Sequence, residues 1–313
     1  MDEHIPVLVE EMLSALAPVA GGYYVDATFG RGGHTARLLA ALGGEGRVLA
    51  IDQDGEAIAA GLKRFADEVR LTLVHAPFAD LATVVSAHAP KDEQGHPCVR
   101  GVLFDLGVSS PQLDDPARGF SFRADGPLDM RMDTAHGEPV SAWLARAGVD
   151  EIREVIATLG EERFARRVAQ AIEIARREQP ITRTSELAEI VSRAVRTREP
   201  GKHPATRTFQ ALRMYINDEL GQLERGLAAA ASVLAIGGRL AAITFHSLED
   251  RMVKRFMQGV TRVDPELARL PIIPESAEPT FTVVGKKARP GDAERASNPR
   301  SRSAMLRVIE RVR

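Results

Sequence analysis

The sequence predicts an α/β fold in which a mostly parallel, doubly wound sheet is interrupted by an inserted helical domain. Apolar runs and helical patterns alternate through the first third of the chain, as in β-α-β units. Glycines or acidic residues follow several of these runs, where an open α/β sheet holds its ligands. More than 130 residues then separate the fourth predicted strand from the fifth, whereas one crossover helix needs roughly a few tens.

The predicted strands are short apolar segments bounded by glycine or acidic residues. In the first third of the chain they cover residues 23–29, 47–51, 69–75 and 99–106. The helical patterns between them cover 35–42, 54–65 and 78–88. A long helical pattern from about 206 to 234 precedes a strand at 239–245, and a terminal hairpin at the sheet edge is expected from 281–284 and 303–309. Strands of this kind predict a sheet buried on both faces.

The long gap holds helical patterns that Pro180, Pro200-Gly201 and Pro204 separate from one another. These patterns cover 139–147, 150–158, 161–177 and 185–195. We therefore predict that residues 1–115 and 204–313 form the α/β domain, and that residues 116–203 form the inserted helical domain.

Composition places the chain among ordinary globular proteins. It has 313 residues, of which 44% are hydrophobic and 27% charged. Cys98 is the single cysteine, which excludes an intramolecular disulfide and fits a reducing compartment. The acidic start lacks the pattern of a signal peptide, and no apolar run approaches the roughly 18 residues of a membrane span. These features predict a soluble, cytoplasmic protein without a membrane partner.

The charge is unevenly distributed, although the net charge is only −2. Between Arg163 and Arg213, twelve Lys or Arg residues stand against five Asp or Glu residues. Between Gly285 and Arg313 the numbers are nine against three. Such segregation can present a basic surface to phosphates. Solvated helix faces explain the same pattern, so charge alone leaves both interpretations open.

A glycine-rich segment, residues 26–34 (DATFGRGGH), ends the first predicted strand and opens a helix. Its glycines allow the backbone to approach a ligand, and the helix N-terminus supplies free N–H groups. A dinucleotide fingerprint requires a third glycine where this chain has Thr35. The segment therefore matches the shorter loop of methyltransferases better, and a tight strand-to-helix turn is the alternative.

Two acidic residues and one aromatic residue follow the other predicted strands. Asp52 lies 20 residues after Gly32, where nucleotide-binding folds place an acid that accepts hydrogen bonds from ribose hydroxyls. Alternatively, Asp52 is solvated and Asp54 caps the next helix. Phe78 either covers an adenine face or belongs to the core. Asp105 is expected to accept a hydrogen bond from the cofactor or a target amine, unless it caps a loop.

Several other chemistries lack their motifs. Neither CxxC nor HExxH occurs, so no metal site is predicted. Ser247 has no nucleophile elbow around it and is interpreted as a helix N-cap, with Asp250 completing a capping box. Cys98 precedes the fourth strand, which is a poor place for the thiolate that C5 methylation of a pyrimidine requires.

Longer motifs resemble the bacterial small-subunit rRNA (cytosine-N4)-methyltransferases, the RsmH or MraW family. They follow the family's order along nearly the whole chain, and residues 264–279 match least. The motifs are 4–8 (HIPVL), 28–34 (TFGRGGH), 105–114 (DLGVSSPQLD), 119–122 (GFSF), 125–133 (DGPLDMRMD), 160–165 (GEERFA), 202–210 (KHPATRTFQ), 245–251 (FHSLEDR) and 298–303 (NPRSRS).

The resemblance implies a class I, Rossmann-like methyltransferase fold that binds S-adenosylmethionine, with an inserted domain that recognises RNA. It implies as substrate the exocyclic amine of a cytidine in the decoding region of small-subunit (16S) rRNA. The expected partners are the small ribosomal subunit and its rRNA, while dimerisation is left open. The residues implied as cofactor contacts are Gly32, Gly33, His34, Asp52, Phe78, Asp105 and Gln112.

Asp105 is also the candidate catalytic residue, because a carboxylate that holds an amino hydrogen would orient the nitrogen lone pair. The target base must leave its stack to reach such a pocket. His203 and His246 either line the substrate side or have core and capping roles. We expect the surrounding RNA to be bound by basic residues of the insertion and the tail, namely Arg163, Arg166, Arg167, Arg196, Arg198, Lys202, Arg207, Lys286, Lys287, Arg300 and Arg302.

Three alternatives remain at this point. An NAD(P)-dependent oxidoreductase shares the strand-end glycine loop and Asp52, although Thr35 argues against it. An RNA-binding assembly factor could keep the fold without activity. Among methyltransferases, C5 or ribose 2′-O transfer competes with N4 transfer, and the absent strand-end cysteine disfavours C5 transfer.

Overall fold

The structure is a computed structural model that describes residues 6–195, 201, 203–270, 272 and 274–313. It divides into two compact units. The α/β unit comprises the chain up to Gly107 together with Leu220–Arg313, and the helical unit is Val108–Glu219. The insertion therefore starts earlier and ends later than the predicted 116–203.

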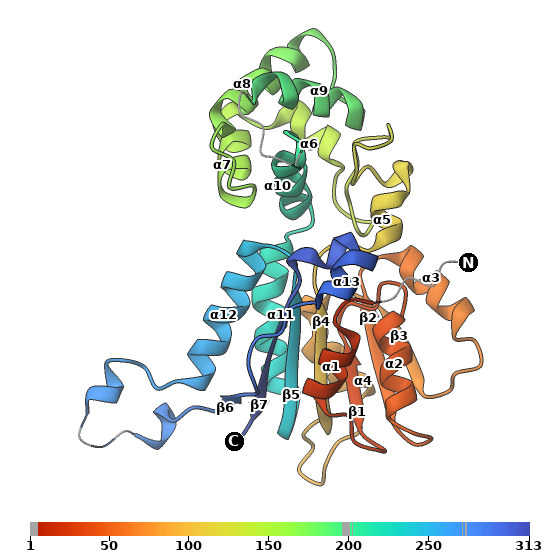
Figure 1. The fold of residues 1–313 in the computed structure, drawn as a ribbon, viewed down its shortest axis with the longest axis vertical. Helices are drawn as coiled ribbons and strands as arrows, with labels where there is room; N and C mark the ends of the chain where they lie inside the picture. The colour runs from red at the N-terminus through yellow and green to blue at the C-terminus, as the bar shows by residue number, and fades with distance from the viewer. Residues whose placement is uncertain (1–5, 196–200, 202, 271, 273) are drawn as a thin grey trace. The chain divides into compact units, whose positions relative to one another are not determined.

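A seven-stranded sheet forms the centre of the α/β unit, with strand order β3-β2-β1-β4-β5-β7-β6 (Figure 1). The strands β3, β2, β1, β4 and β5 pair in parallel, whereas β7 pairs antiparallel with both β5 and β6. The predicted fold class and the predicted hairpin at the sheet edge are thus confirmed. The strands are β1 Tyr23–Asp26, β2 Arg47–Asp52, β3 Leu71–His75, β4 Val99–Asp105, β5 Leu234–Thr244, β6 Phe281–Val283 and β7 Met305–Arg311.

Helices cover both faces of the sheet because the strand residues alternate between two apolar clusters. Tyr24 and Ala50 belong to the cluster with α1 and α2, whereas Val25 and Ile51 belong to the cluster with α4, α11 and α12. Strands that are buried on both faces read as continuous apolar runs, as the sequence does. The helices are α1 Val9–Leu16, α2 Gly33–Ala41, α3 Gly55–Arg64, α4 Leu81–His88, α11 Glu219–Val233, α12 Ser247–Thr261 and α13 Asp292–Ser297.

The helical unit has its own core, built around the fully buried Trp143. Apolar residues from five helices meet in this cluster, and the amphipathic periodicity of each helix explains which face it buries. The helices of this unit are α5 Ser110–Asp114, α6 Val140–Arg146, α7 Val149–Leu159, α8 Ala165–Glu178, α9 Thr184–Ala194 and α10 Thr206–Ile216.

The single helix predicted from 206 to 234 is wrong, because the chain forms α10 and α11 with a break between them. Asp218 adopts a left-handed backbone conformation with φ of 47°, which no α-helix accommodates. Leu212 of α10 is buried in the helical core, whereas Leu227 of α11 is buried against the sheet. The apolar pattern continues across the break, although α10 and α11 pack in different cores. The boundary between the helical unit and the α/β unit therefore lies beyond the predicted residue 203.

None of the helices in the described part of the chain has the length and hydrophobicity of a membrane-spanning segment.

Candidate functional site

The glycine-rich segment turns sharply between β1 and α2. Gly30 and Gly32 have φ values of 54° and 71°, in the left-handed region that favours glycine. A Cβ on Gly32 would lie 2.6 Å from ring atoms of Phe29 and Phe65, and one on Gly33 would lie 2.4 Å from Pro6. Close packing and backbone geometry therefore require both predicted cofactor-contact glycines.

Asp26 lies beneath this turn and fixes it. Its carboxylate accepts hydrogen bonds from the Thr35 hydroxyl at 2.7 Å and from the Thr28 amide at 3.2 Å. Burial raises the pKa of Asp26 above its usual value, although both hydrogen bonds oppose this effect. The sequence interpretation treated Thr35 only as a missing glycine. The sequence does carry a signal for this role: a hydroxyl residue in the first turn of the helix, nine residues after an acid at the end of a strand.

Asp52 closes β2 and receives two backbone amides. Gly30 donates to Oδ2 at 2.7 Å and Asp54 donates to Oδ1 at 2.8 Å. Burial raises the pKa of Asp52 to about 6, against the effect of those two hydrogen bonds. Asp54 caps α3 by accepting from the Glu56 amide at 3.0 Å, as the alternative interpretation expected. Asp52 is nevertheless half-buried and held by the loop, not simply solvated.

Asp105 closes β4 and faces His34. Its Oδ2 lies 3.3 Å from His34 Nδ1, and its backbone amide donates to the Thr28 hydroxyl at 2.6 Å. Its Oδ1 is buried and has no hydrogen-bond partner in the described part of the chain. A buried acceptor without a partner is costly, so this oxygen marks where a donor from a ligand would bind.

Phe78 follows β3 and contributes to the core. Its ring packs edge-on against Phe104, with centroids 5.5 Å apart, and it closely approaches Gly226. The side chain is half-buried. The predicted core role is confirmed, and the adenine contact stays a prediction.

Gln112 belongs to the helical unit, whereas the other predicted cofactor contacts belong to the α/β unit. Gln112 is buried, and its Oε1 accepts a hydrogen bond from the Ser109 amide at 2.9 Å. This interaction belongs to a capping box at the start of α5.

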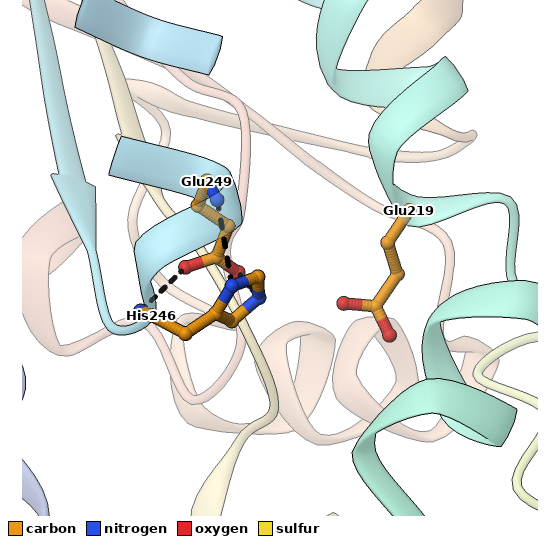
Figure 2. Close-up of side chains that lie close together, drawn as sticks. All are labelled: Glu219, His246 and Glu249. Carbon is orange, nitrogen blue, oxygen red and sulfur yellow. Dashed lines mark hydrogen bonds and ion pairs between the residues drawn. The ribbon is translucent and has the colours of Figure 1, made fainter. Parts of the chain in front are cut away.

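Of the two histidines considered for the substrate side, His246 caps a helix and His203 packs against an aromatic ring. His246 precedes α12 as its N-cap and accepts from the Glu249 amide, while Glu249 Oε2 accepts from the His246 amide (Figure 2). The predicted N-cap at Ser247 is therefore wrong by one residue, with Glu249 in place of Asp250. His203 stacks on Phe122 with centroids 4.5 Å apart and accepts from a nearby backbone amide.

The predicted RNA-binding residues that are described lie at the surface. Of these, Arg167 and Arg207 are half-buried and the others are exposed. Arg207 donates to the Glu161 carbonyl, which ties it to its own unit. Arg196, Arg198 and Lys202 lie outside the described residues. The described members are Arg163, Arg166, Arg167, Arg207, Lys286, Lys287, Arg300 and Arg302.

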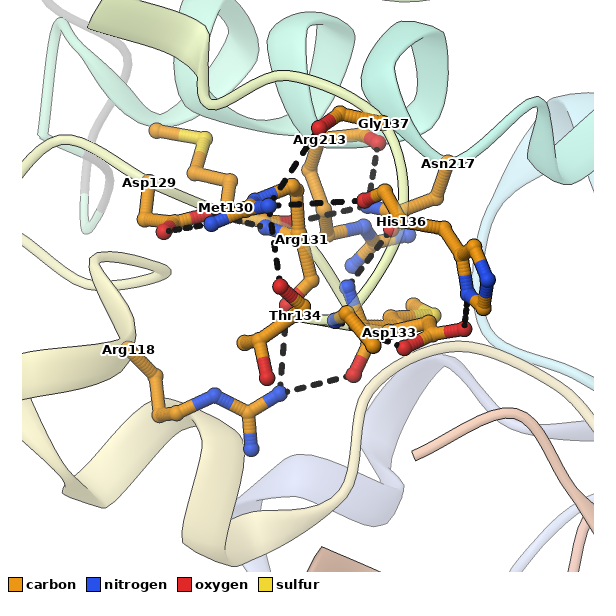
Figure 3. A network of polar contacts seen from close by, with 12 residues as sticks. Arg118, Asp129, Met130, Arg131, Asp133, Thr134, His136, Gly137, Arg213 and Asn217 are labelled. Carbon is orange, nitrogen blue, oxygen red and sulfur yellow. Dashed lines mark hydrogen bonds and ion pairs between the residues drawn. The ribbon is translucent and has the colours of Figure 1, made fainter. Parts of the chain in front are cut away.

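A polar network in the helical unit was missed by the sequence interpretation (Figure 3). The buried Asn217 accepts from the Met132 amide at 2.7 Å and donates to the Met130 carbonyl at 2.8 Å. The buried Arg118 donates to the carbonyls of Arg131 and Met132. These groups hold the segment around Met130, whose φ of 65° is unusual for a residue with a side chain. The motif DGPLDMRMD thus contains a loop fixed by distant side chains.

Comparison with known proteins identifies the family. The sequence profile of the MraW methylase family matches residues 1–312. The chain belongs to this family. It is a methyltransferase that uses S-adenosylmethionine, so the oxidoreductase alternative does not hold.

Three similar proteins are each named "Ribosomal RNA small subunit methyltransferase H". The protein from Azoarcus sp. (strain BH72) is 54% identical over 310 residues, which is 99% of this chain and 97% of that protein. The protein from Aromatoleum aromaticum is 54% identical over 311 residues, with the same coverage. The protein from Dechloromonas aromatica is 52% identical over 310 residues, covering 99% of this chain and 98% of its own.

The strand-end groups of the α/β unit have the chemistry that S-adenosylmethionine requires. Asp52 offers carboxylate oxygens for ribose hydroxyls. Phe78 is half-buried and has an aromatic face for a base. The residues therefore fit the cofactor.

Proposed function

We propose that this protein transfers a methyl group from S-adenosylmethionine to N4 of a cytidine in the decoding region of 16S rRNA, in the cytoplasm. Two observations support the proposal. Relatives that are 50–54% identical over 99% of the chain are named as small-subunit rRNA methyltransferases. Asp105 Oδ1, buried at the end of β4 without a described partner, is the single structural observation that carries the amine target.

Bound S-adenosylmethionine supplies an electrophilic methyl group on its sulfonium, so the protein mainly supplies geometry. The exocyclic amine is a weak nucleophile because its lone pair is conjugated with the ring. We assign Asp105 Oδ1 to accept one N–H of that amine and so direct the lone pair towards the methyl group. Alignment at a reacting distance of about 3–3.5 Å accounts for most of the expected rate enhancement. The methylated nitrogen is strongly acidic and loses a proton to water, so no strong base is needed.

The other predicted site residues divide between the cofactor and the RNA. We assign Asp52 to the ribose hydroxyls, Phe78 to the adenine, and the turn with Gly32, Gly33 and His34 to the methionine part. Gln112 is assigned to the cofactor through the family resemblance alone. The basic residues at the surface are assigned to RNA phosphates around an unstacked target base.

The test is methyl transfer from labelled S-adenosylmethionine to small ribosomal subunits from cells that lack the protein, followed by nucleoside mass spectrometry. We expect labelled N4-methylcytidine with the wild type and almost none with Asp105→Asn. Asp67→Asn, an exposed acid of the same unit, is the matched control and should retain full activity.

The product also separates the alternatives. A labelled C5-methylcytidine or ribose 2′-O-methyl product would refute the assigned position on the nucleotide. No label in subunits or naked rRNA, despite cofactor binding, would refute the assigned substrate and favour the non-catalytic assembly factor.

A further inference from the structure

His34 is a buried histidine whose two ring nitrogens both face acceptors. Nε2 lies 2.9 Å from the Val7 carbonyl oxygen, and Nδ1 lies 3.3 Å from Asp105 Oδ2. Only 5% of the residue is exposed, so water cannot replace either partner easily. A carbonyl only accepts hydrogen bonds, so Nε2 must carry a proton. A bare Nδ1 would then point its lone pair at a carboxylate oxygen, which is unfavourable.

We propose that His34 is a positioning residue that carries protons on both ring nitrogens and holds Asp105 as its carboxylate partner. The proton on Nδ1 occupies Oδ2 and leaves Oδ1 as a fixed, anionic acceptor at the end of β4. The catalytic consequence rests on the proposed function, whereas the protonation state does not.

The charges around His34 support a stable imidazolium. Burial disfavours the charged ring, but Asp105 and, from the end of β1, Asp26 raise the pKa of His34 above its usual value. The N-terminal segment contributes the uncharged Val7 carbonyl.

The Val7 carbonyl is itself held in place. Leu8 has a left-handed φ of 55°, and its amide donates to Glu294 Oε1 of α13 at 2.8 Å. Pro6 fits against Gly33, where a Cβ would collide with its ring. The acceptor for Nε2 is therefore fixed by a residue near the C-terminus, and the ring cannot easily turn away from Asp105.

A fixed anionic acceptor distinguishes amine from carbonyl substrates. The exocyclic N–H of cytosine can donate to Asp105 Oδ1, whereas the O4 carbonyl of uracil would present a second acceptor and repel it. A site that accepts a hydrogen bond from a substrate N–H strongly disfavours an analogue that lacks this N–H. Holding Asp105 as a carboxylate would therefore contribute to the choice of cytidine.

The test begins with the full-length protein alone, with its histidine rings labelled with 15N, and follows ring protonation by NMR as the pH is raised. We expect both nitrogens of His34 to stay protonated above pH 6.5, the ordinary pKa of histidine. In Asp105→Asn the pKa of His34 should fall by about one unit or more. A neutral ring with an unprotonated Nδ1 at pH 6 would overturn the proposal, as would a pKa that Asp105→Asn leaves unchanged.

A kinetic test uses His34→Gln, which retains a donor but cannot titrate. Wild-type kcat/KM should fall as the pH rises through the pKa of His34, and this decline should be absent in the variant. We expect kcat to drop about tenfold through looser alignment. A decline that persists in His34→Gln would contradict the role. If that variant does not fold, the His34 ring signal is assigned through bonds from its own backbone amide. The NMR titration then decides alone, whatever substrate the enzyme proves to methylate.

Discussion

In the α/β unit, carboxylates lie where strands end and can still accept hydrogen bonds. In the helical unit, by contrast, Arg118 and Asn217 form hydrogen bonds with the protein's own backbone. Asp105 Oδ1 meets no described group, and Asp52 is held by two amides with its pKa raised. Asn217, by contrast, makes hydrogen bonds through both atoms of its amide. Buried polar groups thus stabilise a loop in the helical unit, whereas in the α/β unit Asp105 Oδ1 has no partner among the described residues.

The largest expected effect comes from Asp105→Asn, which changes the strand-end acceptor. We expect kcat to fall at least about 100-fold, because an amide offers a weaker acceptor to the target amine. Stability should fall by about 1 kcal/mol or more, since the variant leaves the buried His34 ring without its carboxylate partner. Single-turnover methylation and thermal unfolding measure the two effects. A variant with normal turnover would show that Asp105 is not catalytic.

Asn217→Ala should do the opposite. It removes the partners of the Met132 amide and the Met130 carbonyl, so the helical unit should lose about 2–3 kcal/mol of unfolding free energy. Hydrogen exchange of α7 and α10 amides would measure this loss. Binding of S-adenosylhomocysteine should keep its affinity, because Asp52 and Asp105 belong to the other unit. Weakened binding of that ligand would mean that the two roles are not separate.

The pKa of Asp52 gives a third test. In the free protein its raised pKa of about 6 means that its carboxylate is ionised above pH 6 and protonated below it. Ribose hydroxyls bind the ionised form better, so the Kd for S-adenosylhomocysteine should rise about tenfold per pH unit below 6. The raised pKa also affects stability. The contribution of Asp52 to the free energy of unfolding is largest at pH values below the pKa of this residue in the unfolded chain, and it is lost as the pH rises through 6.

Calorimetric titrations from pH 5 to pH 8 would measure the dependence on Asp52. The control is Asp52→Asn, in which the affinity should be weak and nearly independent of pH. An equally steep dependence in this variant would assign the titration to another group.

The smallest expected effect is on the salt dependence of RNA binding and concerns exposed lysines of the α/β unit. Replacing Lys286 and Lys287 with Gln should reduce the salt dependence of RNA binding by about one to two logarithmic units per logarithm of salt concentration. Lys63→Gln with Lys254→Gln, also exposed in the α/β unit, is the matched control. Filter binding at several salt concentrations measures the slope, and equal slopes would make the first pair ordinary solvated surface.

Local patterns in the sequence were enough to predict the sheet, the glycine turn and the strand-end positions of Asp52 and Asp105, because these depend on periodicity and on where a strand ends. It also indicated an insertion through the distance between two strands. The pattern from 206 to 234 misled the prediction, since apolar periodicity does not reveal which core a face will join.

The contacts between residues far apart in the chain could be known from the three-dimensional arrangement alone. His34 lies between Val7 and Asp105, and Asn217 reaches Met130 and Met132. The reason is that a hydrogen bond depends on positions in space to within a few tenths of an ångström, whereas sequence patterns fix only the order and the facing of elements. The protonation of His34 is a property of that arrangement and of no single motif.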